Sequence, residues 1–210
     1  MLGHSPRPED RETTKELVGG SVSLKGVTII LAPEEIEKAR DWSHRKALAK
    51  TPEGHHQVDN RSEVKRSLTG ITGEMAVEKL LARTFIDWGI GKSSRYAKPD
   101  LEPIGLNWGV KTVSIDLNHA IQIENHYPQV MVLKRSNAEL EVMGLATTEV
   151  LNSYQDASLI KDKRMRARKT AFTGYEHLMP GGLLKDYVDC LLYEWEWQPR
   201  YANKPLKTIG

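Results

Sequence analysis

The chain has little cysteine and no long apolar segment, and each shortage excludes a class of protein. Its single cysteine, Cys190, cannot form a disulfide within the chain, which excludes a disulfide-stapled fold. It lies in the apolar-patterned stretch from Leu183 to Leu192, which favours a buried structural thiol over a catalytic one. The longest apolar runs, such as Val27 to Ala32, fall far short of the roughly 20 residues that span a bilayer. We therefore expect no membrane partner.

Charge of one sign is also scarce, because the formal net charge is only +2. The overall balance therefore does not indicate a nucleic-acid partner. Residues 1–16 lack an apolar core followed by a small-residue cleavage site, so they do not resemble a secretory signal. These features predict a cytoplasmic protein.

Length and patterning favour one α/β domain with extensions at both ends. Residues 1–20 are expected to form a flexible arm, residues 21–194 the domain, and residues 195–210 a Trp- and Pro-bearing extension. The spacing of apolar residues predicts a clear helix over Ile71 to Arg83, and Pro33 is expected to open an earlier helix that ends near Ala49.

The remaining predicted elements lie mostly downstream of that helix. Asp100 to Ser114 is expected to form two adjacent strands with a turn near residues 105–107. The others are a strand or hairpin over Ser21 to Leu31, strands over Gln129 to Lys134 and Leu140 to Ala146, a capped helix over Thr147 to Tyr154 and a helix over 183–194.

Three short motifs fall on these elements in a telling order. Gly73-Glu74 lies on the helix, Pro99-Asp100 begins the strand pair, and Gly109-Val110-Lys111-Thr112 lies on its second strand. This order resembles the core of the PD-(D/E)xK phosphodiesterase superfamily, and the strand over 127–133 is similar to small phage and bacterial members. The resemblance covers about residues 68–153.

The resemblance implies a restriction-endonuclease-like fold, a mixed central sheet flanked by helices, and a metal-dependent DNA endonuclease or exonuclease. Asp100 would bind Mg²⁺ or Mn²⁺ directly, with the backbone carbonyl of Val110 completing the shell. Glu74 would bind a metal through water or hold a second metal. Lys111 would orient the attacking water or offset developing charge. For a phage-encoded chain, cytoplasmic means the host cytoplasm.

The chain departs from the pattern at Gly109, where the superfamily has Glu or Asp two residues before the lysine. Strand alternation would put that acid on the same face as Lys111, and a glycine is expected to leave room there. Glu102 is the first substitute, since it would share a face with Asp100 on an extended strand. Glu78, Gln122 and Glu124 are further candidates. Alternatively, the site is inactive.

A basic run supplies the candidate DNA contacts, unless it is only a solvated surface. Its residues are Lys161, Lys163, Arg164, Arg166, Arg168 and Lys169. Two alternatives to a nuclease stay open. One is an inactive nuclease-fold protein that binds DNA or assists assembly. The other is a structural protein whose Trp195, Trp197 and Tyr201 dock a partner. The sequence also allows a homodimer.

Overall fold

The computed structural model describes residues 26–50, 62–91, 98–115, 121–123, 126–160, 163–166 and 169–201. The expected arm over residues 1–20 lies outside these ranges. The elements are β1 (Val27–Ile30), α1 (Pro33–Lys50), α2 (Glu63–Leu81), η3 (Glu102–Ile104), β2 (Gly109–Ser114), β3 (Ile121–Ile123), β4 (Gln129–Lys134), β5 (Glu139–Ala146), α3 (Thr148–Ser153), η5 (Ala157–Leu159), α4 (Lys163–Arg166), β6 (Thr170–Phe172), η6 (Tyr175–His177), β7 (Met179–Pro180) and α5 (Gly181–Tyr201).

The central sheet is mixed, which confirms the α/β class. Its strand order is β1-β5-β4-β2, and β7 adds to β5. The strands β2 and β4 are parallel, whereas β5 is antiparallel to both β1 and β4. All six residues of β4 are buried because neighbouring strands flank it and side chains cover both of its faces. β2 is therefore the outer strand on the side of the sheet opposite β1.

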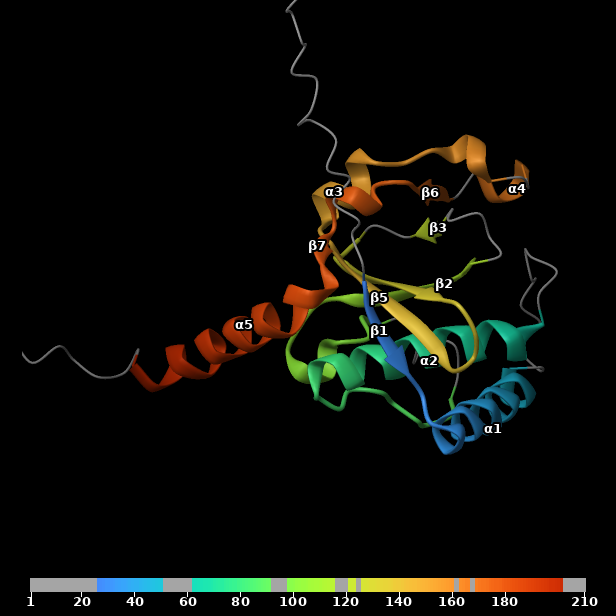
Figure 1. The fold of residues 1–210 in the computed structure, drawn as a ribbon, viewed down its shortest axis with the longest axis horizontal. Helices are drawn as coiled ribbons and strands as arrows, with labels where there is room; N and C mark the ends of the chain where they lie inside the picture. Colours follow the sequence, from blue (N-terminus) through green and yellow to red (C-terminus); the bar gives the residue numbers. More distant parts are fainter. Residues whose placement is uncertain are drawn as a thin grey trace, which may run out of the picture.

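Helices α1 and α2 form a layer below the sheet, with α2 next to the strands (Figure 1). α1 begins at Pro33 as expected, with acidic residues in its first turn near the positive helix end. α2 begins at Glu63 rather than at Ile71, because the Ser62 side chain accepts a hydrogen bond from the Lys65 N–H. Its first two turns are largely polar, so the apolar spacing did not show them.

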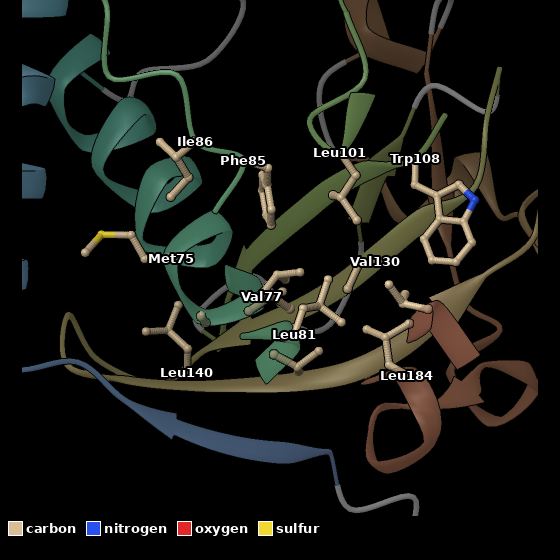
Figure 2. Close-up of a cluster of buried hydrophobic side chains, with 14 of the residues drawn as sticks. Met75, Val77, Leu81, Phe85, Ile86, Leu101, Trp108, Val130, Leu140 and Leu184 are labelled. Carbon is tan, nitrogen blue, oxygen red and sulfur yellow. The ribbon is translucent and has the colours of Figure 1, made fainter. Parts of the chain in front are cut away.

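The sheet separates two hydrophobic cores. The larger core joins α1, α2, α5 and one sheet face, and Figure 2 shows Met75, Val77 and Leu81 of α2 beside Val130 and Leu140 of the strands. The smaller core lies on the opposite face and consists of Val113, Met131, Ala146, Leu151, Phe172 and Leu178. Alternation along β4 sends Val130 and Val132 to the first core and Met131 to the second.

The prediction of two adjacent strands over Asp100 to Ser114 is wrong, since β2 is the one strand in this segment. Residues 100–105 form a turn and the short helix η3 instead. Pro103 fits the first turn of η3 because it needs no N–H there, and Gly105 ends it with a positive φ of 88°. The Leu101 N–H still donates to the Trp108 carbonyl at 3.0 Å, which fastens this segment to the start of β2.

The other expected elements are confirmed, with one change in burial. β1, β4, β5, α3 and α5 occupy the expected regions, and the Thr147 side chain caps α3 by accepting from the Val150 N–H. Cys190, however, is exposed, because α5 buries a different stripe that includes Leu184, Val188 and Leu192. Every helix in the described part of the chain is too short or too polar to cross a membrane.

Candidate active site

Asp100 lies against the outer edge of β2, and its carboxylate is held there by the backbone. The N–H of Val110 donates to the Asp100 Oδ2 at 2.6 Å. This N–H is available because, among the described strands, β2 pairs only with β4, which lies on its other side. The next residue, Leu101, is fully buried and anchors the segment in the larger core. The fold therefore fixes both the position and the orientation of Asp100.

Glu74 reaches this edge from α2, and the preceding glycine permits the close approach. A Cβ added at Gly73 would lie 1.7 Å from the Thr112 Oγ1 of β2, so no larger residue fits without a shift. The Thr112 hydroxyl has no hydrogen-bond partner within the described ranges, and close helix packing covers it. Gly73 thus lets α2 lie directly on β2, which brings Glu74 towards Asp100.

The two carboxyl groups are close enough to perturb one another. Burial first, and then the charge of Asp100, raises the pKa of Glu74 to about 8, although Lys46 opposes the shift. Glu74 keeps some solvent access as a residue, yet protein atoms surround its carboxyl group densely. Burial also raises the pKa of Asp100, against the Val110 hydrogen bond and the charges of Lys46 and Lys111. The structure therefore brings Glu74 and Asp100 together as an acidic pair.

Two lysines accompany this acidic pair, and sequence reasoning found only one of them. Lys111 lies near Asp100, although strand alternation directs its side chain to the sheet face opposite α2. Lys46 of α1 acts on both carboxyl groups, and its Nζ lies 4.4 Å from the centre of the Trp42 ring. In the sequence, Lys46 resembled an ordinary cation near a helix end, so nothing linked it to Glu74.

Of the expected substitutes for the third carboxylate, the structure describes the side chains of Glu78 and Glu102, and each is bound elsewhere. The Glu78 carboxylate accepts the N–H groups of Phe85 and Ile86 at 2.6 and 2.7 Å, so it fastens the chain after α2. Glu102 is exposed on η3 and pairs with Lys98 at 2.9 Å. It does not share a strand face with Asp100, because that segment is not extended. The side chain of Gln122 and all of Glu124 lie outside the described residues.

Gly109 does not leave the expected room. A Cβ at this position would lie 2.7 Å from the Gln129 Oε1 and 2.8 Å from the Tyr127 Cε2. Gln129 is only 7% exposed. A side chain from the neighbouring strand β4 therefore occupies the space that an acid at position 109 would use. Over the described ranges, no three His, Cys, Asp or Glu side chains cluster closely enough to hold a metal ion.

The basic run is described only in part. Lys163 and Arg166 are exposed on the single turn α4, and the Arg166 Nε donates to the Ile160 carbonyl. Lys169 is half-buried. Lys161 and Arg168 lie outside the described residues, as does the side chain of Arg164. The side chains of Trp195, Trp197 and Tyr201 are also outside them, although their backbone belongs to α5.

Comparisons with protein-family models, with curated proteins and with solved structures gave no match for this chain. The chemistry of the site is therefore the basis for a function. Two carboxyl groups in a poorly solvated place repel each other, and a divalent cation would relieve that repulsion. Hard carboxylate and carbonyl oxygens are the ligands that Mg²⁺ and Mn²⁺ prefer, so Asp100, Glu74 and the Val110 carbonyl fit such an ion.

Proposed function

We propose that this chain is a Mg²⁺- or Mn²⁺-dependent nuclease that hydrolyses phosphodiester bonds in DNA. The observation that carries the proposal is the acidic pair of Glu74 and Asp100, half-buried at the outer edge of β2 with Lys46 and Lys111 nearby. Burial of like charges costs stability, and such an arrangement is typical of functional sites. Asp100 and the Val110 carbonyl would hold the cation, with Glu74 as a further ligand.

Each residue has a defined task in hydrolysis. A bound divalent cation would supply a Lewis acid for the phosphate and lower the pKa of a bound water. Lys111, whose charge acts on Asp100, would orient the attacking water or offset negative charge on the phosphate. Lys46 would add a second positive charge beside the same carboxylates. The Val110 N–H, which donates to the Asp100 carboxylate, would keep it in place through the reaction.

DNA is the proposed substrate because the motifs resemble those of a DNA-cleaving superfamily. Exposed charges at Lys163 and Arg166 would add phosphate contacts, as would the rest of the basic run over 161–169. An inactive nuclease-fold protein that binds DNA is the second candidate. The observation in its favour is that the described residues offer two clustered carboxylates rather than three.

Cleavage of a DNA substrate separates the two candidates. We expect wild type to cut plasmid or oligonucleotide DNA with Mg²⁺ or Mn²⁺ and to stop when EDTA removes the metal. Asp100→Asn should lose nearly all cleavage, because it removes a ligand charge and keeps the side-chain shape. Glu149→Gln, an exposed carboxylate in the first turn of α3, is the matched control and should cut normally.

Two outcomes would overturn the nuclease proposal. If the Asp100→Asn variant cuts DNA at the wild-type rate, Asp100 is not a metal ligand and the proposed metal site is wrong. Wild type that binds DNA in a salt-sensitive manner, yet cuts nothing with either metal, would establish the second candidate.

A further inference from the structure

Gln129 is a buried polar residue that the fold places over a glycine at the proposed site. It begins β4 in parallel register with Gly109 of β2, and the Gly109 N–H donates to the Pro128 carbonyl at 2.9 Å. Paired residues of neighbouring strands present their side chains on the same sheet face. The Gln129 Oε1 and Nε2 lie 2.7 and 3.0 Å from the position of a Gly109 Cβ. The amide group therefore stands where a side chain of Gly109 would stand.

Gln129 and Asp100 approach the same peptide group of β2 from its two sides. Asp100 accepts the N–H of the peptide that joins Gly109 to Val110, on the outer edge of the strand. Gln129 covers Gly109 from β4, on the inner edge. Lys111 projects from the same face as Gln129, two residues further along β2. A side chain that carries an amide oxygen and is 7% exposed thus covers the residue next to the N–H group that holds Asp100.

We infer that Gln129 supplies the third side-chain oxygen for the divalent cation, in place of an acid at position 109. This inference rests on the proposed function, because it assigns a ligand to the same metal site. Side-chain amide oxygens bind hard divalent cations in proteins. A neutral ligand also has a physical advantage here, since Glu74 and Asp100 already repel each other and a third carboxylate would add to that repulsion.

Calorimetric titration of Mn²⁺ tests the assignment with substitutions of similar size. Gln129→Leu keeps the volume and removes the oxygen, so its Kd for Mn²⁺ should rise about tenfold or more. Gln129→Glu adds a charged oxygen at the same reach, so its Kd should fall. Gln155→Leu is the matched control. Gln155 is a half-buried glutamine whose Nε2 donates to the Leu151 carbonyl, and its loss should leave the Kd unchanged.

The outcomes separate this inference from the proposed function. Wild type and Gln129→Leu that bind Mn²⁺ equally well would overturn the ligand assignment and leave the nuclease proposal intact. Wild type that neither binds Mn²⁺ nor cuts DNA would overturn both. If circular dichroism shows that Gln129→Leu does not fold, Gln129→Glu decides the question, and an unchanged or weaker affinity in that variant would overturn the inference.

Discussion

The larger hydrophobic core and the outer edge of β2 both include residues of helix α2, yet burial has opposite effects on stability in the two regions. In the core, α2 presents Val77 and Leu81, and burial of such side chains stabilises the fold by about 1.5–3 kcal/mol each. At the edge, the same helix presents Glu74, whose burial beside Asp100 opposes ionisation. The same helix therefore supports the fold at Val77 and Leu81 and maintains a site, at a cost in stability, at Glu74.

Among the changes proposed here, a substitution in the larger core should cause the greatest loss of stability. Leu140 is fully buried between the sheet and α2, so Leu140→Ala leaves a cavity (Figure 2). We expect a loss of about 3 kcal/mol in the free energy of unfolding, measured by urea denaturation. Leu48→Ala is the control, because Leu48 is exposed on α1 and its loss should change stability by less than about 0.5 kcal/mol. Equal effects of the two substitutions would contradict the assigned core.

A substitution at the outer edge of β2 should instead raise the free energy of unfolding, and the size of this gain should depend on pH. The folded-state pKa of Glu74 is raised from 4.5 to about 8, so the folded protein holds a proton that the unfolded chain releases. The stability that protonated Glu74 contributes is therefore fully present below about pH 4.5 and is lost as the pH rises through about 8.

Glu74→Gln removes this loss because glutamine does not titrate. Without metal, the variant should exceed wild type by about 2 kcal/mol near pH 8.5 and by much less near pH 4.5. Thermal unfolding at the two pH values measures the difference. A variant that is less stable than wild type at the higher pH would show that the folded state does not disfavour the ionised form of Glu74.

The third prediction concerns the contact between Gly73 of α2 and Thr112 of β2. Gly73→Ala would put a methyl group 1.7 Å from the Thr112 Oγ1, so α2 must move away from β2. We expect a loss of about 1–2 kcal/mol, together with weaker Mn²⁺ binding. Thr112→Ala removes that oxygen, so the double variant should recover part of both losses in a double-mutant cycle. Additive losses would mean that the contact does not position Glu74.

Local chemistry made much of the fold predictable from the sequence. Pro33 and Thr147 mark helix starts through their own backbone and side-chain preferences, and the structure has helices there. The same kind of reasoning was wrong for Asp100 to Ser114, where Pro103 and Gly105 favour η3 over a strand. It was wrong for Cys190 because the spacing of apolar residues on α5 did not reveal which stripe is buried.

The site was less predictable, because its proximity relations depend on tertiary packing. Glu74, Asp100 and Lys111 came from a resemblance to known motifs. The structure places Asp100 near each of the other two. Lys46 and Gln129 carry no such motif. Gln129 meets Gly109 only because β2 and β4 pair in parallel, and Lys46 meets the acidic pair only because α1 packs on α2. No local pattern encodes either contact.

Thermal unfolding with Mn²⁺ or with EDTA at about pH 8 tests the central claim most directly, namely that Glu74 and Asp100 form one cation site that is unstable without its ion. Binding to the folded state alone raises stability by about 2.7 kcal/mol when the ligand is at 100 times its Kd. We predict that Mn²⁺ raises the Tm of wild type clearly, and that Glu74→Gln and Asp100→Asn lose most of this increase. A Tm of wild type that Mn²⁺ does not change, or an equal increase in all three proteins, would contradict the claim.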